Sequence, residues 1–395
     1  MEVLSMKRRI LFFHYEFPGG GGERVTKDIA RYLQPFGYET YIVTSNRKDG
    51  QTPEVTLIEL PDRRLDSKDN ADAIIHAILS LSIDVFIVPG FLLDHLEYIR
   101  KQTNCRFVYI LHNVPFWEAI AKLERRKRVQ GSLAKKMEWY LLGYPKAVWL
   151  KLYMKKCIED YKKTYDIVDA YVVLCDAYKE QLIKTLGLPA KNKLYVIHNS
   201  EEKVNNVNLN KKKQVLFVGN MIYENKRVDR LLDIWGMVYE KLPDWELVLV
   251  GGGKEMDALQ KQATQMNLKR VNFVGGTQDV QSYYRDASIS CLTSTFEGWP
   301  LCLTEAQANG VVPIAFNCCA GIDEILSPSG VNGILVSPFD KEKFADELCG
   351  LLTSPDKIEQ MRNMVLLKSQ DYSMDIIGPK WNALFEQLLE DGSSK

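Results

Sequence analysis

The sequence of 395 residues lacks an excess of either charge, because 51 Lys+Arg balance 51 Asp+Glu and the formal net charge is zero. A chain without net positive charge is not expected to bind nucleic acid over a wide surface. It also lacks an apolar run of the roughly 18 residues that cross a membrane. MKRRILFF places basic residues before an apolar run, but His14 and Glu16 end that run too early for a signal peptide. We therefore expect a cytoplasmic protein.

Disulfide and metal-binding motifs are also missing. The 8 cysteines form no CxxC, and their spacing fits neither a zinc site nor a disulfide framework. Most lie in apolar runs, where a free cysteine behaves as a small hydrophobic residue, so we expect reduced thiols in the core. No Asp-x-Asp motif and no other cluster of metal ligands occurs in the chain. We expect no cofactor and no required metal.

The chain does contain short β-rich runs that alternate with helical patterns such as 23–33 and 71–80. These runs are rich in Val, Ile, Tyr and Phe and mostly continuous, as in strands buried on both faces. The alternation predicts a parallel sheet with helices on both sides. The strands predicted in the first half are 9–15, 39–45, 55–60, 84–90, 106–112, 170–175 and 193–198.

A polar, Asn- and Lys-rich stretch without periodicity, residues 200–214, predicts a linker between domains. The alternation restarts after it. The predicted strands are then 214–220, 245–253, 270–276, 287–293, 311–316 and 333–337, and the predicted helices include 227–241, 254–266 and 303–309.

Two domains follow from the length and the linker, because 395 residues exceed one ordinary core. We predict an N-terminal Rossmann-like domain of residues 1–204 and a C-terminal one of residues 205–372. A helix at 373–390 should pack back on the first domain. Ligands of such doubly wound sheets bind beyond the carboxyl ends of the strands, so the two domains should face a cleft.

Four consecutive glycines, Gly19–Gly22, follow the first predicted strand directly. No Gly-Lys-Ser/Thr follows, which excludes a P-loop, and Glu23 and Arg24 stand where a dinucleotide fingerprint has its third glycine. Residues without Cβ let backbone N–H groups and a helix N-terminus approach an anion or a sugar. From position alone, a flexible turn explains the run equally well.

A pair of cations, Lys226 and Arg227, stands at the start of a predicted helix, after a strand that ends at Gly219. Two cations beside a helix N-terminus can hold a diphosphate. Taken alone, such a pair is more often a solvated helix start.

The stretch STFEGWPLCLTEAQANG, residues 294–310, carries two glutamates eight apart, Glu297 and Glu305. Pro300 suits the first turn of a helix, so Glu297 should precede that helix and Glu305 should lie about one and a half turns inside it. Carboxylates repel phosphates, so a sugar diol such as ribose is the expected partner of Glu305.

Together these motifs resemble the retaining glycosyltransferases of family 4 (glycosyl transferases group 1), which have the GT-B fold. The resemblance covers nearly the whole chain and rests on GGGGERV, VGNMIYENKR, LVGGG, FVGG, FEGWPLCLTEAQANG and GVNGILVSPFD in this order. It implies an α/β GT-B protein that moves a hexose or N-acetylhexosamine from a nucleotide sugar to an acceptor with retention of configuration. UDP is favoured as the nucleotide and GDP comes second.

The resemblance also implies a role for each candidate residue. Glu305 would hold the ribose, Glu297 would face the transferred sugar, and Lys226 would neutralise the diphosphate. His112, at the end of a predicted strand, would lie near the sugar, although a lone histidine there is more often an ordinary polar neighbour. The further donor-binding candidates are Gly20, Gly21, Gly22, Asn220, Arg227, Val274, Gly298, Trp299 and Leu301. No carboxylate stands out as a nucleophile, which favours front-face attack with the departing phosphate accepting the acceptor's proton.

Three positions near the proposed site, Asn220, Arg227 and Pro300, depart from the family pattern, and Gly310 and Pro313 are three apart, one more than the common spacing. Asn220 stands where the family usually has Arg, and Arg227, where the family often has Gly, can compensate for the lost charge. Pro300 replaces a common Gly and removes an N–H group, so the amides of Trp299 and Leu301 are the expected donors to the sugar.

Residues 122–163 carry the strongest local charge bias, with 13 Lys/Arg against 4 Asp/Glu and interleaved Trp and Tyr. Basic and aromatic residues in helices suit an anionic membrane surface, although a solvated helical face explains the bias equally well. No matching basic stripe elsewhere favours nucleic acid. We expect peripheral binding to the inner face of the membrane, where a glycan or lipid-diphosphate-linked acceptor of a surface polysaccharide, lipopolysaccharide or capsule pathway would be extended.

Other functions stay open at this point. A non-hydrolysing sugar-nucleotide epimerase shares the two-domain architecture, and Asn220 is compatible with a catalytically dead nucleotide-sugar-binding protein. A dehydrogenase is disfavoured, since neither domain has a proper dinucleotide fingerprint.

Overall fold

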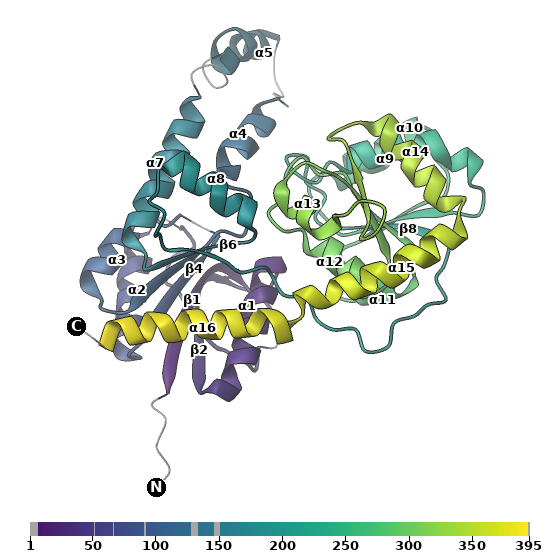
Figure 1. The fold of residues 1–395 in the computed structure, drawn as a ribbon. Coiled ribbons are helices and arrows are strands. Elements are labelled where there is room, and N and C mark those ends of the chain that lie inside the picture. The colour runs from purple at the N-terminus through teal and green to yellow at the C-terminus, as the bar shows by residue number, and fades with distance from the viewer. Residues whose placement is uncertain are drawn as a thin grey trace. The chain divides into compact units, whose positions relative to one another are not determined.

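The computed structural model of the protein describes residues 7–50, 52–65, 67–90, 92–127, 133–145 and 151–393. The chain forms two compact units, each built on a parallel sheet (Figure 1). The first unit contains the described residues up to Pro115, Met154–Ser200, and those from Met374 on. The second contains Phe116–Tyr153 and Glu201–Ser373. The chain therefore passes from one unit to the other at four places, after Pro115, Tyr153, Ser200 and Ser373.

The sheet of the first unit has seven strands within the described residues, in the order β3-β2-β1-β4-β5-β6-β7. Its strands are β1 (Arg8–Phe17), β2 (Tyr38–Arg47), β3 (Thr56–Glu59), β4 (Val85–Pro89), β5 (Arg106–Ile110), β6 (Ala170–Val173) and β7 (Leu194–Val196). All pairings are parallel. Ile10, Leu11 and Phe12 of β1 have no exposed surface, because helices cover both faces of the sheet. The strand order reverses between β1 and β4.

Helices of the first unit join these strands. They are α1 (Gly21–Leu33), α2 (Lys68–Ser80), α3 (Leu96–Gln102), α7 (Leu152–Ile167), α8 (Asp176–Leu186) and α16 (Met374–Ser393), with a 3₁₀ turn at Gln34–Phe36. The last helix, α16, packs against α1 (Figure 1). Trp381 and Phe385 of α16 are buried there, and the ring of Phe385 lies 6.1 Å from that of Tyr38.

The second unit has six strands within the described residues, in the order β10-β9-β8-β11-β12-β13. They are β8 (Gln214–Val218), β9 (Glu246–Val250), β10 (Val271–Gly275), β11 (Ile289–Leu292), β12 (Val312–Phe316) and β13 (Ile334–Val336). All are parallel, and the order reverses between β8 and β11. The two doubly wound sheets confirm the predicted fold class, and every strand predicted from the sequence is present.

Helices cover both faces of this second sheet. They are α9 (Val228–Val238), α10 (Met256–Gln265), α11 (Gln281–Asp286), α12 (Leu301–Ala308), α13 (Ala320–Leu326), α14 (Lys341–Leu352) and α15 (Pro355–Ser369), with 3₁₀ turns at Tyr239–Lys241 and Gln370–Tyr372. The helices α9, α10 and α14 lie on one side of the sheet, and α11, α12 and α15 lie on the other (Figure 1).

The stretch predicted as a linker is bonded to the second unit along much of its length. Residues 201–213 belong to the second unit, and the ammonium of Lys211 donates to the carbonyl oxygens of Arg285 and Asn309 at 2.9 and 2.8 Å. These carbonyls lie at the ends of α11 and α12, where a cation is favourable. Burial lowers the pKa of Lys211 to about 8. A polar stretch without periodicity is thus bound to the second unit, and Lys211 is one of its anchors.

The predicted basic segment is described only in part, since residues 128–132 and 146–150 lie outside the described residues. The remainder forms α4 (Trp117–Lys127), α5 (Leu133–Glu138), a π-helical turn (Trp139–Gly143) and the start of α7. Across the part of the chain that the structure covers, no helix is both long and apolar enough to traverse a bilayer.

Candidate active site

The reversal of strand order in the second unit brings two loops together. The loop after β8 contains Lys226, and the loop after β11 contains Glu297. The backbone N–H of Thr295 in the second loop donates to the carbonyl of Asn225 in the first at 2.6 Å. Ligands of doubly wound sheets bind at such a point. The candidate residues therefore lie where the topology predicts a site.

Lys226 and Glu297 form a buried ion pair. The Lys226 ammonium lies 2.8 Å from a carboxylate oxygen of Glu297, and the two side chains are 17% and 10% exposed. The hydroxyl of Ser294 donates to the same oxygen at 2.7 Å. Burial opposes the charged ammonium, but the Glu297 carboxylate outweighs it and raises the pKa of Lys226 above its usual value. A positive charge is therefore fixed at the site before any ligand arrives.

Glu305 lies in the middle of a short helix, and its charge acts on Lys226 of this pair. The helix α12 begins at Leu301, and Pro300, which lacks an N–H group, occupies the N-cap. The hydroxyl of Tyr284 donates to a carboxylate oxygen of Glu305 at 2.7 Å. Burial, followed by the charge of Glu305, raises the pKa of Tyr284 well above its usual value, so this hydroxyl stays a donor. One Glu305 oxygen is thereby oriented by a buried phenol.

The remaining candidates of this segment lie around the same turn. Trp299 is buried, and its ring meets that of Tyr372 edge-on at 5.1 Å. Leu301 is the first residue of α12, where backbone N–H groups lack partners within the helix. Burial raises the pKa of the Cys302 thiol to about 12, so it stays neutral. Among the described residues, no group of three or more His, Cys, Asp or Glu could hold a metal ion.

Glycines draw the ends of β8 and β9 together. A Cβ on Gly251 would lie 2.0 Å from the carbonyl oxygen of Gly219, and one on Gly253 would lie 2.5 Å from that of Met221. Both glycines have positive φ, 126° and 149°. The LVGGG motif thus allows backbone to touch backbone. Val274 lies at a bulge in the adjacent β10 and packs against the core cluster that contains Tyr284.

Arg227 and Asn220 occupy two of the positions that depart from the family pattern. Arg227 has a positive φ of 49°, which explains a frequent glycine there. Its guanidinium donates twice to Asp229, at 2.9 and 2.8 Å, and lies 4.3 Å from the centre of the Tyr223 ring. Asn220 is exposed after β8. The Arg227 charge is therefore shared with a neighbouring carboxylate, and its compensation for Asn220 stays a prediction.

The glycine run and His112 meet in the first unit. The helix α1 begins at Gly21 with Gly20 as its N-cap, and His112 follows β5. A carbon of the His112 ring lies 3.8 Å from the place of a Cβ on Gly22. Burial lowers the pKa of His112 to about 4, against an opposing effect of Asn199, so the imidazole is neutral at pH 7.

The sequence did not predict the polar partners of this cluster. The Nε2 of His14 lies 2.9 Å from the Thr26 hydroxyl, and its Nδ1 lies 3.8 Å from a carboxylate oxygen of Glu23. Burial, with a smaller effect of His112, lowers the pKa of His14 to about 3. Burial also raises the pKa of Glu23. A histidine inside an apolar strand was the available signal, because it must find a partner there.

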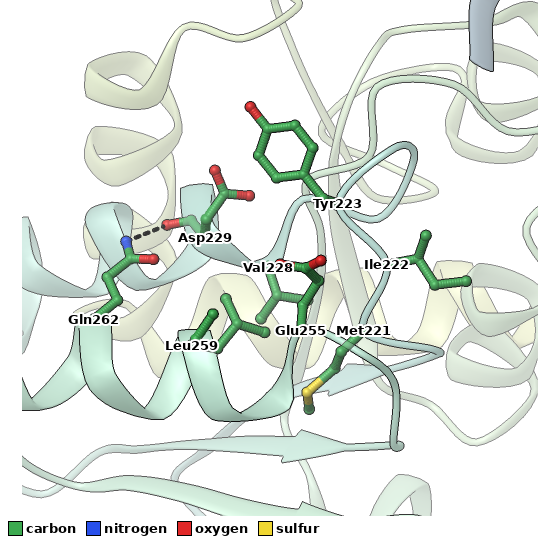
Figure 2. A pocket seen from close by; sticks show the side chains of 9 residues that line it. Met221, Ile222, Tyr223, Val228, Asp229, Glu255, Leu259 and Gln262 are labelled. Carbon is green, nitrogen blue, oxygen red and sulfur yellow. Dashed lines mark hydrogen bonds between the residues drawn. The ribbon is translucent and has the colours of Figure 1, made fainter. Parts of the chain in front are cut away.

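A pocket of about 340 Å³ is lined by residues of the β8–α9 loop, of the start of α9 and of α10 (Figure 2). Met221, Val228 and Leu259 form part of its apolar wall, and Gln262 donates to the backbone carbonyl of Asp229 at 3.1 Å. Neither the ion pair nor Glu305 lines this pocket. Tyr223 and Asp229, the partners of Arg227, do line it, so the pocket adjoins the candidate site through that residue.

Solved structures share the architecture of this chain. Over 96% of this chain and 100% of that chain, the fold matches Anabaena HepE in complex with UDP and glucose, with a TM-score of 0.73 and 16% identity. It matches the apo lipopolysaccharide outer core galactosyltransferase WaaB over 96% of this chain and 99% of that chain, with a TM-score of 0.66 and 18% identity. The protein therefore has the GT-B fold.

Family models account for both units. The model for Glycosyltransferase Family 4 matches residues 19–200, and that for Glycosyl transferases group 1 matches residues 199–365. The chain belongs to the group 1 glycosyltransferases, which confirms the resemblance inferred from its motifs.

Curated relatives align over part of their length. An uncharacterized glycosyltransferase of Haemophilus influenzae is 35% identical over 173 residues, 44% of this chain and 48% of that protein. The amylovoran biosynthesis glycosyltransferase AmsD of Erwinia amylovora is 30% identical over 227 residues, 55% of this chain and 62% of that protein. The matches thus span less than two thirds of either relative.

Proposed function

We propose that the protein transfers a hexose or N-acetylhexosamine from a nucleotide sugar, UDP-linked in preference, to a glycan or lipid-linked glycan in surface polysaccharide biosynthesis. The observation that carries the proposal is the Lys226–Glu297 pair beside Glu305 at the strand-order reversal. The structural neighbour HepE was solved with UDP and glucose. Relatives include a lipopolysaccharide 1,6-galactosyltransferase of Escherichia coli, 31% identical over 194 residues.

Each group then has a chemical task. Glu305, oriented by Tyr284, accepts hydrogen bonds from the ribose diol. Lys226 and the first turn of α12 stabilise the negative charge that develops on the departing diphosphate, which a positive group and a helix N-terminus do without a metal. With retention through front-face attack, the bond from the sugar to the diphosphate breaks on the face where the acceptor bonds. The leaving phosphate oxygen takes the acceptor's proton.

A nucleotide-binding measurement tests the donor site first. Thermal stability is recorded with UDP, GDP, ADP and NAD for the wild type, Glu305→Ala and the control Glu342→Ala, which changes an exposed glutamate on α14. A nucleotide at 100 times its dissociation constant should add about 2.7 kcal/mol. We expect UDP to stabilise the wild type and the control but not Glu305→Ala. If no nucleoside diphosphate stabilises the wild type, the proposal fails.

A membrane surface is the proposed location of the acceptor. The relative in Campylobacter jejuni, 24% identical over 228 residues, is named for an undecaprenol-diphosphate-linked substrate. In this chain, Leu133, Met137, Tyr140, Leu141 and Leu142 are all more than half exposed within the basic segment. Exposed apolar side chains beside basic residues favour the interface of an anionic bilayer.

Flotation with liposomes tests the membrane proposal. Leu141→Gln/Leu142→Gln should reduce binding to vesicles containing phosphatidylglycerol. The control Leu367→Gln changes a leucine on α15 that is 58% exposed, as Leu142 is, and should bind as the wild type does. Neutralising the basic residues of 122–136 should also reduce binding. Equal flotation of all variants would contradict membrane docking.

Product analysis separates the transferase from two other uses of this site. The Arg227 guanidinium is already bonded to the Asp229 carboxylate, and the exposed Asn220 supplies no second cation. This observation favours a catalytically dead binding protein. A transferase releases UDP with acceptor, or slowly with water. An epimerase returns an isomeric UDP-sugar without acceptor, and a dead protein returns the donor unchanged. Mass spectrometry and chromatography of the nucleotide fraction distinguish the three results.

A further inference from the structure

Two of the places where the chain crosses between the units, after Ser200 and after Ser373, lie next to each other within the second unit. Glu201 is its first residue after one crossing, and Tyr372 and Ser373 are its last before the other. The backbone N–H of Glu201 donates to the carbonyl of Tyr372 at 2.8 Å, and Glu201 forms a parallel bridge with Ser373. The two crossing segments are therefore joined by backbone hydrogen bonding.

One crossing segment is also bonded to the helix that carries Glu305. A carboxylate oxygen of Glu201 accepts a hydrogen bond from the hydroxyl of Thr304 at 2.8 Å. Thr304 has no exposed surface, and Glu201 is 6% exposed. Thr304 precedes Glu305 directly, so a movement of this turn of α12 moves both residues. A buried carboxylate is costly unless hydrogen-bonded, so this contact restricts where the turn can lie.

The other crossing segment packs on the start of the same stretch. The ring of Tyr372 meets that of Trp299 at 5.1 Å and an interplanar angle of 84°. Both rings are buried. Trp299 lies two residues after Glu297, so the crossings contact the E-x7-E stretch near each of its glutamates. Edge-to-face rings of this kind hold a defined orientation.

We propose that Glu201 and Tyr372 are positioning residues that couple occupancy of the donor site to the two chain crossings. This inference rests on the proposed function, because it takes a nucleoside diphosphate as the ligand at Glu297 and Glu305. A ligand that binds at Glu297 and Glu305 and shifts α12 displaces Thr304 and Trp299 together. Because these two residues contact Glu201 and Tyr372, the shift orders both crossing segments. The coupling runs in both directions, so the state of the crossings also sets the affinity for the nucleotide.

Hydrogen exchange measured by mass spectrometry, with and without UDP, tests this coupling in the full chain. In the wild type, UDP should slow exchange about tenfold in peptides covering 199–203 and 370–374, as well as at 297–305. Thr304→Val keeps the side-chain shape and removes the hydroxyl. It should still gain protection at 297–305 but lose it at the crossings. The control Thr264→Val removes the hydroxyl of an exposed threonine on α10 and should behave as the wild type.

Substitution of Glu201 separates positioning from simple packing. Glu201→Gln retains an oxygen that can accept from Thr304 and should keep the protection of the crossings, whereas Glu201→Leu should lose it. In transfer assays, Thr304→Val and Glu201→Leu should lower kcat several-fold more than they raise KM for the donor. If Thr304→Val fails to fold, the comparison of Glu201→Gln with Glu201→Leu still tests the same hydrogen bond.

Two results would overturn the inference. Protection of the crossings by UDP that is equal in the wild type, Thr304→Val and Glu201→Leu would show that these contacts carry no coupling, and the proposed function would stand. If UDP protects no peptide of the wild type, including those around Lys226 and 297–305, the donor site and the coupling both fail.

Discussion

The buried ion pair at the donor site gives the most quantitative prediction. Replacing Lys226 with methionine leaves the Glu297 carboxylate in place, 10% exposed, with its cation removed. Breaking a buried pair from one side costs about 3–5 kcal/mol. Because both side chains keep slight contact with solvent and Ser294 still donates to Glu297, we expect the lower end, about 3 kcal/mol.

This loss should appear as a lower melting temperature of the second unit without nucleotide. For a unit of this size, 1 kcal/mol shifts the midpoint by roughly 2–4 °C, so Lys226→Met should melt roughly 6–12 °C below the wild type. Differential scanning fluorimetry at pH 7 is suitable. The pKa of Lys226 is raised on folding, so the contribution of its charge is complete below about pH 10.4, the usual value for lysine, and is lost only above it.

Two further variants decide whether the reasoning holds. Lys213→Met breaks a pair of similar length, 3.0 Å to Asp244, in which the side chains are 59% and 70% exposed, and it should cost about 0–1 kcal/mol. The double variant Lys226→Met/Glu297→Gln removes the orphaned charge and should melt above Lys226→Met alone. If Lys226→Met melts no lower than Lys213→Met, or if the double variant regains nothing, the pair is not the buried pair described above.

Three other predictions follow from the site and its scaffold. Tyr284→Phe should weaken UDP binding about tenfold in calorimetry, because Glu305 loses a donor 2.7 Å away, and an unchanged affinity would contradict that role. Burial holds the pKa of His112 at about 4, so the contribution of its neutral imidazole to stability is complete above about pH 6.5 and is lost as the pH falls towards 4. Between pH 7 and pH 5 the wild type should therefore lose about 2 kcal/mol more of its free energy of unfolding, measured in urea, than His112→Asn loses. Equal losses would refute this. Gly251→Ala should lower the melting temperature by more than 5 °C, roughly the effect of 2 kcal/mol, since its Cβ would lie 2.0 Å from a carbonyl oxygen, whereas Gly276→Ala, with no atom within 4 Å, should have little effect.

The strands were predictable because each is a short apolar run bounded by polar or glycine residues. RILFFHY predicted β1 (Arg8–Phe17), and VVPIAF predicted β12 (Val312–Phe316). Burial on both faces makes such runs continuous, so the pattern is local and needs no knowledge of neighbours. Their order in the sheet is not local. The pairing of Lys226 with Glu297 depends on β8 lying beside β11, which are far apart in the sequence.

Hydrogen-bond partners that come from other helices or segments could not be predicted from the sequence for the same reason. Tyr284 reaches Glu305 from α11, and Glu201 reaches Thr304 from the crossing segment. Nothing in the local pattern distinguishes this tyrosine from its neighbour Tyr283. The role of Lys211 could not be predicted either, because a lysine that bonds to the ends of two helices and a solvated lysine can have the same neighbours in the sequence.

The return of the chain at Ser373 has a consequence for synthesis on the ribosome. The first unit needs α16, whose Trp381 and Phe385 fill its core, yet α16 is translated after the whole of 201–373. Domains usually fold in the order in which they emerge. Here the second unit can fold around its six-stranded sheet before α16 is translated. Until then, the apolar side of α1 in the first unit has no helix packed on it. The unit that contains β1 is therefore completed only after the second unit has been translated.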